Sequence, residues 1–224
     1  MKFYNFARDS NDGRELYIEG EISDSVWFGD ECTPGQFRKE LFSGKDDITL
    51  WINSNGGDCI AASQIYTFLM DYPGEVTVKI HGMAASAASV IAMAGTKVLM
   101  SPTALMLIHN PWTMAIGDKY DMEKAGVLLD EVKQSILNAY EIKTGLSRTK
   151  LSHLMDDETP MSVHTAIALG FCDGILQAQP RPASVDANGC NVTLPPVANK
   201  SKTTVESRIE RLNLIMGRKN PCQN

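Results

Sequence analysis

Short apolar runs alternate with helix-like segments along much of this chain, and this alternation constrains the fold more than any other feature. Residues 48–52 (ITLWI) and 76–80 (VTVKI) have the length and side-chain pattern of buried strands. Residues 59–70 and 86–94 follow them with the apolar spacing and small side chains of helices. Strands separated by helices need crossover connections, which join parallel strands. We therefore expect an α/β fold with a mainly parallel sheet and crossover helices.

Further segments extend the pattern. Strands are expected at residues 15–21, 98–100, 105–108 and 172–176, helices at 37–41, 119–144, 147–154 and 163–169, and turns at 53–58 and 82–83. The helix at 119–144 carries an apolar stripe at helical spacing, which is wide enough to bury one face. The stripe consists of Met122, Ala125, Leu128, Leu129, Val132, Ile136 and Tyr140.

Composition changes after residue 177. Prolines, with serine, asparagine and lysine, dominate residues 178–224, which is typical of a flexible segment that buries little. Residues 203–216 have the spacing of a short amphipathic helix that could dock on a partner chain. The predicted organisation is a folded domain at 1–177 and a proline-rich tail at 178–224.

Charge and cysteine content exclude several classes of protein. The formal net charge is -6, without the clustered lysine and arginine of a nucleic-acid-binding protein. The first twenty residues lack the apolar core of a signal peptide, and the longest apolar stretch, around residues 84–95, is too short to span a membrane. The five cysteines are an odd number without a CxxC pair, which argues against disulfides and a zinc site. We expect a cytoplasmic protein that needs no metal or cofactor.

Ser86 is the first candidate for chemistry, because it lies where a predicted strand gives way to a helix. A hydroxyl at that position is close to the positive end of the helix dipole and to backbone N–H groups that have no intrahelical partner. These groups could stabilise an oxyanion. On local sequence alone, tight packing of a small-residue helix on the sheet is the favoured explanation of the segment. Ser89 is a weaker candidate because it would point into that packing.

A serine nucleophile needs a base, and His109 is the best placed of the four histidines. It follows the strand at 105–108, so it is expected at an edge of the sheet. His81 precedes the glycine turn before Ser86 and could be a neighbour of the site. His153 and His164 fall on predicted helices and are expected to be solvated.

An acid that orients the histidine could come from the loop at residues 156–159 (DDET), which offers three carboxylates. A solvated acidic loop is the alternative, and local sequence does not choose among the three. The glycine-rich segment at 53–57 (NSNGG) is a second, independent feature. The N–H of Gly57 could form one half of an oxyanion hole and the N–H of Ala87 the other half.

Together these segments resemble the Clp protease proteolytic subunit. The matching motifs, in the family's order, are LYIEGEI at 16–22, WINSNGG at 51–57, GMAAS at 82–86, MLIHNP at 106–111 and AIALGFCD at 166–173. The resemblance spans about residues 15–177. It implies a crotonase-like fold, with Ser86 as nucleophile and His109 as general base of a serine endopeptidase that forms an acyl-enzyme.

The same resemblance implies partners and a third site residue. The family forms ring-shaped homo-oligomers, of the heptamer or double-ring kind, around a peptidase chamber, and the helix at 119–144 resembles the protruding handle that interlocks two rings. The family's third catalytic residue is an Asp, and Glu158 stands in that register with Asp157 one residue earlier. Glu158 is favoured as the orienting acid, and Asp157 remains the alternative.

The wording of the motifs (NSNGGD, LIHNPWT, MDDETPMS) is similar to the Clp-like proteases of phage and prophage head-assembly clusters. This resemblance implies a prohead maturation protease with a capsid or scaffold protein as its polypeptide substrate, and with or without an unfoldase ATPase. Two rival hypotheses remain: a crotonase-type acyl-CoA enzyme, and a catalytically inactive ring-forming assembly protein.

Overall fold

The described part of the chain, which in this computed structural model comprises residues 7–8, 13–24 and 32–177, contains eight strands and six helices. The strands are β1 (Ala7–Arg8), β2 (Arg14–Ile22), β3 (Ile48–Gly57), β4 (Val76–Ala85), β5 (Lys97–Met100), β6 (Leu105–Ile108), β7 (Thr159–Ser162) and β8 (Gly174–Ile175). The helices are α1 (Pro34–Leu41), α2 (Cys59–Met70), α3 (Ala87–Ala92), α4 (Lys119–Thr144), α5 (Arg148–Asp156) and α6 (Val163–Ala168).

The strands form one sheet in the order β1-β2-β3-β4-β5-β8. Off this order, β6 pairs with the last residues of β4, and β7 pairs with β6. The pairs β2–β3, β3–β4, β4–β5, β4–β6 and β5–β8 are parallel, whereas β1–β2 and β6–β7 are antiparallel. The expectation of a mainly parallel α/β sheet with crossover helices is confirmed.

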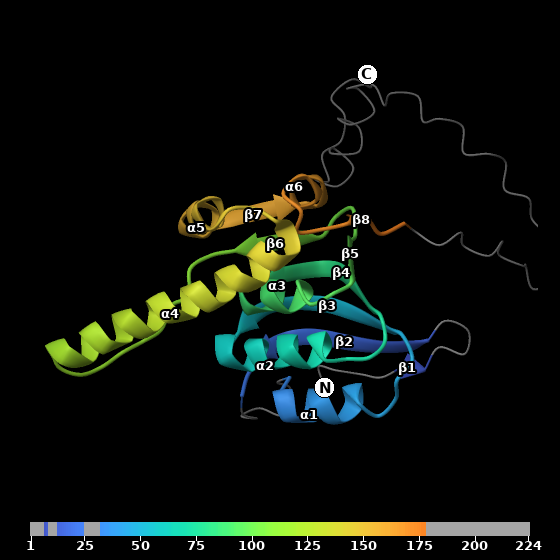
Figure 1. Cartoon of the computed structure of the whole chain (residues 1–224), viewed down its shortest axis with the longest axis horizontal. Helices are drawn as coiled ribbons and strands as arrows, with labels where there is room; N and C mark the ends of the chain where they lie inside the picture. The colour runs from blue at the N-terminus through green and yellow to red at the C-terminus, as the bar shows by residue number, and fades with distance from the viewer. Residues whose placement is uncertain (1–6, 9–12, 25–31, 178–224) are drawn as a thin grey trace, which may run out of the picture. The chain divides into compact units, whose positions relative to one another are not determined.

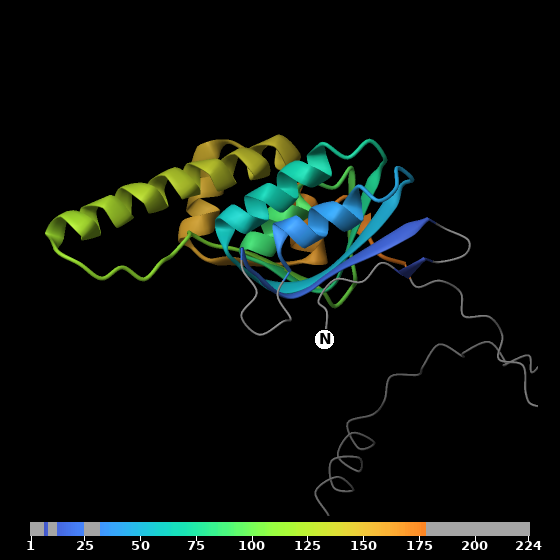
Figure 2. The same ribbon diagram turned by 90° about the horizontal axis from the view of Figure 1, so that it is seen from below.

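Helices cover the apolar face of this sheet. Figure 2 shows α1, α2 and α3 on the same side of the central strands. Alternate residues of these strands are fully or almost fully buried on the face that the helices cover: Leu16, Ile18, Ile48, Leu50, Ile52, Val76, Val78 and Ile80. The strands therefore alternate between a buried and a partly exposed face, although parallel sheets are often buried on both.

Two predicted turns are wrong, because the strands continue through them. β3 extends to Gly57 and β4 to Ala85, so both segments that were expected to be turns (53–58 and 82–83) are mostly extended. The ends of these strands find partners: Gly56 pairs with Glu21 of β2, and Ala84 pairs with Met106 of β6. Glycine discourages strands locally, and this long-range pairing overrides that preference.

The predicted helix α4 has the expected bounds, but its stripe is buried only in its second half. Ile136 and Tyr140 are buried, whereas Met122 and Leu128 in the first half are exposed. Figure 1 shows this first half extending beyond the sheet. The stripe therefore packs within the described domain only in the second half of the helix.

Two strands were not predicted from the sequence. β7 begins at Thr159, inside the segment that was assigned to a loop, and pairs antiparallel with β6. β1 is only two residues long. The predicted tail at 178–224 and its short amphipathic helix lie outside the described residues, so the domain division stays a prediction. In the ranges that the structure covers, none of the helices is long and apolar enough to cross a membrane.

Candidate active site

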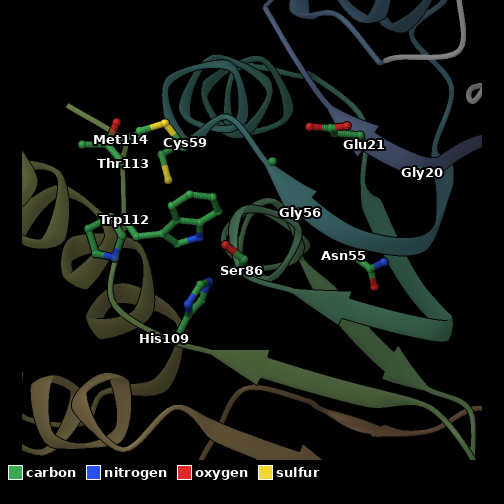
Figure 3. A pocket seen from close by; sticks show the side chains of 12 residues that line it. Gly20, Glu21, Asn55, Gly56, Cys59, Ser86, His109, Trp112, Thr113 and Met114 are labelled. Carbon is green, nitrogen blue, oxygen red and sulfur yellow. The ribbon is translucent and has the colours of Figure 1, made fainter. Parts of the chain in front are cut away.

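A cavity of about 560 Å³ opens at the ends of β2, β3, β4 and β6. Its position agrees with the rule that ligands bind outside the carboxyl ends of parallel strands. Figure 3 shows the side chains that line it. The lining residues are Gly20, Glu21, Asn55, Gly56, Gly57, Cys59, Ser86, His109, Pro111, Trp112, Thr113 and Met114.

Ser86 lies between β4 and α3, as the N-cap residue of the helix. Its backbone has φ 54° and ψ -126°, a conformation that residues other than glycine rarely adopt. Such a conformation costs about 1–3 kcal/mol and persists only where the surrounding structure imposes it. A sharp, strained turn from strand to helix projects a serine hydroxyl away from the backbone and into the cavity, as a nucleophile requires.

His109 reaches the same cavity from β6. The parallel pairing of β4 with β6 aligns Ala85 with Leu107, and the Ser86 N–H donates to the Leu107 carbonyl at 2.9 Å. Both strands therefore end together, and the structure brings Ser86 and His109 to one cavity. In Figure 3 the imidazole extends from the end of β6 toward Ser86. Between described residues, no hydrogen bond joins the two side chains.

The glycine-rich end of β3 packs against the nucleophile turn. Gly56 has φ +98°, and a Cβ placed on it would lie 2.8 Å from the Ser86 Cβ and 3.0 Å from the Ala87 nitrogen. Gly57, at φ +144°, lies even closer to the backbone of Ile22, and a Cβ placed on it would overlap the Ile22 carbonyl oxygen. Gly57 lines the same cavity as Ser86, and Ala87 directly follows Ser86, so both predicted oxyanion donors belong to this site. Ala87 is the first residue of α3, whose N–H has no intrahelical acceptor.

The three carboxylates at 156–158 have different surroundings. Asp156 accepts hydrogen bonds from Lys133 at 2.6 Å and from Asn110 at 2.9 Å, and these bonds, that of Lys133 first, lower the pKa of its carboxyl. Asp157 caps the end of α5 through its backbone N–H. Glu158 has φ 46° and is exposed. Ile108 pairs with Thr159 in antiparallel register. His109 follows Ile108 and Glu158 precedes Thr159, so the two residues lie at the same end of the strand pair.

Neither Asp157 nor Glu158 lines the cavity, and among the described interactions no hydrogen bond or ion pair joins either of them to His109. The structure thus brings Ser86, His109, Gly57 and Ala87 together, and leaves the candidate acids next to this group but outside the cavity.

Other residues that the sequence singled out lie elsewhere. Ser89 is fully buried in α3, as expected. His81 does not line the cavity; its Nε2 lies 3.5 Å from the Glu19 carboxylate on the partly exposed face of the sheet. His153 and His164 are exposed on α5 and α6. Cys59 does line the cavity, but burial, reinforced by the Asp58 carboxylate, raises the pKa of its thiol and keeps it protonated.

The walls of the cavity were not identified from the sequence. Trp112 and Met114, in the segment that follows His109, give one side an apolar character, and Glu21 adds a carboxylate from the end of β2. Figure 3 shows the Trp112 indole and Glu21 on different sides of Ser86. Their proximity to His109 along the chain could have indicated Trp112 and Met114; nothing local indicates Glu21, which reaches the site through the pairing of β2 with β3. Within the described ranges, no cluster of His, Cys, Asp or Glu could hold a metal ion.

Comparison with known families identifies the relatives of this chain. A family model described as Clp protease matches residues 37–179, which is well over half of the 224 residues. The matched stretch begins in α1 and includes Ser86, His109, Asp157 and Glu158.

Proposed function

The chain belongs to the Clp protease family, a family of serine peptidases, and from this premise we propose that it is an endopeptidase with Ser86 as nucleophile and His109 as general base. The observation that carries the proposal is the strained Ser86 backbone in a cavity that His109 also lines. A strained, cavity-facing serine next to a histidine suits acyl transfer, and it would be a costly arrangement in a purely structural turn.

The proposed reaction starts with attack of the Ser86 Oγ on the carbonyl carbon of the scissile peptide bond. His109 accepts the hydroxyl proton as the C–O bond forms. The negative charge moves to the carbonyl oxygen, which accepts hydrogen bonds from the N–H groups of Gly57 and Ala87. His109 then gives the proton to the leaving amine, the C–N bond breaks, and an acyl-enzyme remains.

Water completes the cycle. His109 accepts a proton from the water molecule, the new hydroxyl attacks the ester, and the Ser86 oxygen leaves with that proton. Glu158 is proposed as the acid that holds the imidazole in its productive orientation, since the register of β6 with β7 brings it next to His109. Asp157 is the alternative.

The substrate is a polypeptide, and the finer assignments of its source rest on resemblance. We propose a prohead maturation role, with a capsid or scaffold protein as substrate, because the motifs around Asn53, His109 and Asp156 are similar to those of phage-encoded relatives. An oligomeric ring, stacked through α4, is part of the same proposal. The exposed apolar first half of α4 supports it.

Labelling with a fluorophosphonate probe tests the assignment. The wild-type protein should react once per chain, at Ser86, and should cleave casein and fluorogenic peptides. Ser86→Ala should abolish labelling and lower peptide cleavage by several powers of ten, with the native mass unchanged. His109→Ala should suppress both activities, whereas the matched variant of an exposed histidine, His153→Ala, should retain them.

The rival hypotheses give other results. Full activity in Ser86→Ala would reject the nucleophile. Tight binding of acyl-CoA without labelling would favour a crotonase-type enzyme. A protein that assembles into rings but neither labels nor cleaves would be an inactive assembly protein.

A further inference from the structure

Helix α4 is connected by hydrogen bonds to the nucleophile turn. The Ser89 hydroxyl donates to the Ser86 carbonyl oxygen at 2.5 Å and lies 2.8 Å from the Tyr140 hydroxyl. Since the Ser89 hydroxyl has a single hydrogen, which is used on Ser86, Tyr140 is the donor to Ser89. Tyr140 and Ser89 are both buried, so the hydrogen bond between their hydroxyls is shielded from water, whereas the bond to the Ser86 carbonyl is partly buried. Tyr140 of α4 is thus linked to the backbone of Ser86.

The packing around Tyr140 holds this connection in place. Its ring meets Phe171 edge-on, with the ring centroids 5.4 Å apart, and both side chains are almost completely buried. The Ser89 N–H also donates to the Ser86 carbonyl, at 2.9 Å. The Ser86 carbonyl oxygen therefore accepts two hydrogen bonds from Ser89, one from its N–H and one from its hydroxyl. The hydroxyl is in turn oriented by Tyr140 of α4.

A second connection runs from the same helix to the histidine. Lys133 of α4 donates to the Asp156 carboxylate at 2.6 Å, and the Asn110 amide donates to the same oxygen at 2.9 Å. Asn110 directly follows His109 and begins the segment that forms a wall of the cavity. Asp156 thus bridges α4 and the chain at the end of β6.

Lys133 and Tyr140 are seven residues apart, which is two helical turns, so they project from neighbouring positions on one side of α4. We propose that α4 is a positioning element for the catalytic pair: Tyr140, through Ser89, holds the backbone of Ser86, and Lys133, through Asp156 and Asn110, holds the chain that carries His109. None of these five residues lines the cavity, so they are positioning residues. The inference rests on the proposed function, because it concerns the same pair.

The physical reason is the precision that proton transfer needs. The strained conformation of Ser86 relaxes unless neighbouring groups oppose the relaxation. A displacement of about 1 Å in a reacting group can lower the rate about 100-fold. Loss of either connection should therefore slow the chemical step more than it weakens substrate binding.

Three variants of the intact protein test the proposal: Tyr140→Phe, Ser89→Ala and Lys133→Met. We expect kcat, and the rate constant for fluorophosphonate labelling of Ser86, to fall about 10- to 100-fold, with KM changed less than about twofold. Lys133→Arg keeps a charged donor and should recover most of the lost activity. Melting temperature and native mass are measured alongside.

Matched controls separate positioning from general stability. Lys143→Met breaks the 2.8 Å ion pair between Lys143 and Asp173. Like the Lys133–Asp156 pair, it involves a lysine of α4 and is partly exposed, but Asp173 leads into β8 and away from the cavity. Tyr72→Phe removes another buried tyrosine hydroxyl, whose 2.6 Å hydrogen bond goes to the Asp46 carbonyl. Both controls should label at nearly the wild-type rate, even where their melting temperatures fall.

The outcomes are distinct. Labelling of Tyr140→Phe, Ser89→Ala and Lys133→Met at the wild-type rate would overturn the positioning role while the proposed function stands. Equal losses in the controls, in step with melting temperature, would also overturn it. If Tyr140→Phe does not fold, the Lys133 and Ser89 variants decide. A wild-type protein that is not labelled at Ser86 would contradict the proposed function itself.

Discussion

Backbone strain coincides with the candidate chemistry at the scale of single residues. Among the described residues, Ser86 and Glu158 are the two residues other than glycine with positive φ. One is the proposed nucleophile and the other the proposed orienting acid. Each lies at a junction, Ser86 between β4 and α3, and Glu158 between α5 and β7. Strain at both of these proposed site residues is consistent with selection for their geometry over stability.

The third catalytic residue can be tested by neutralising each carboxylate in turn. We expect Glu158→Gln to lower kcat about 10²- to 10⁴-fold, because an amide cannot stabilise the imidazolium that forms as Ser86 attacks. Asp157→Asn should stay within about twofold of the wild-type rate. Steady-state kinetics on one fluorogenic peptide provides the comparison. The reverse ranking would transfer the role to Asp157, and full activity in both variants would mean that Ser86 and His109 act without an acid.

Strand ends that continue through glycine-rich segments create the cavity at the scale of secondary-structure elements. β3 and β4 extend into regions whose composition predicts turns, and their last residues carry the site. The sequence predicted the helix bounds of α2 and α4 well, because capping and helical spacing are local. It missed the strand extensions because their hydrogen-bond partners, β2 and β6, are far away along the chain.

Substitution of Gly56 tests how closely these elements must approach. In Gly56→Ala the new methyl group would lie 2.7 Å from the Ala85 carbonyl oxygen, at a φ that alanine disfavours. We expect a loss of about 1–3 kcal/mol in the free energy of unfolding and strongly reduced labelling of Ser86, measured by denaturant titration and probe kinetics.

Gly126→Ala is the matched control for this change. Gly126 lies inside α4 with open space around its Cα, so alanine should raise the free energy of unfolding by about 0.5–1 kcal/mol and leave labelling unchanged. Unimpaired labelling in Gly56→Ala would show that the close contact with Ser86 is dispensable.

At the scale of the whole molecule, exposed apolar side chains gather on the first half of α4 in the described part of the chain. Tyr120, Val127 and Leu128 share one exposed surface with charged neighbours. A contiguous apolar surface on one element is a common sign of a protein interface. In the proposed ring assembly, this half of α4 packs on the second ring.

Charged substitutions on this surface test the assembly. Val127 and Leu128 are 64% and 60% exposed in the single chain, so the double change to Glu should leave the melting temperature of the subunit nearly unchanged. We expect the native mass to fall from that of stacked rings to that of a single ring or smaller species, measured by native mass spectrometry. Ile142→Glu, at a 71% exposed position near the end of the same helix, is the control and should assemble normally. An unaltered mass in the double variant would contradict stacking through α4.

The sequence alone determined the helices, the central part of most strands and the family, because strand alternation, helical spacing, capping and short motifs depend on neighbouring residues. It did not predict β1, β7 or the ends of β3 and β4. It indicated Ser86 and His109 individually. Only the tertiary structure brought them to one cavity, since 23 residues separate them and the pairing of β4 with β6 closes that gap. The positions of Glu21, Tyr140 and Lys133 relative to the site became known only from the tertiary structure, because their contacts join segments that are distant along the chain and that no local pattern relates.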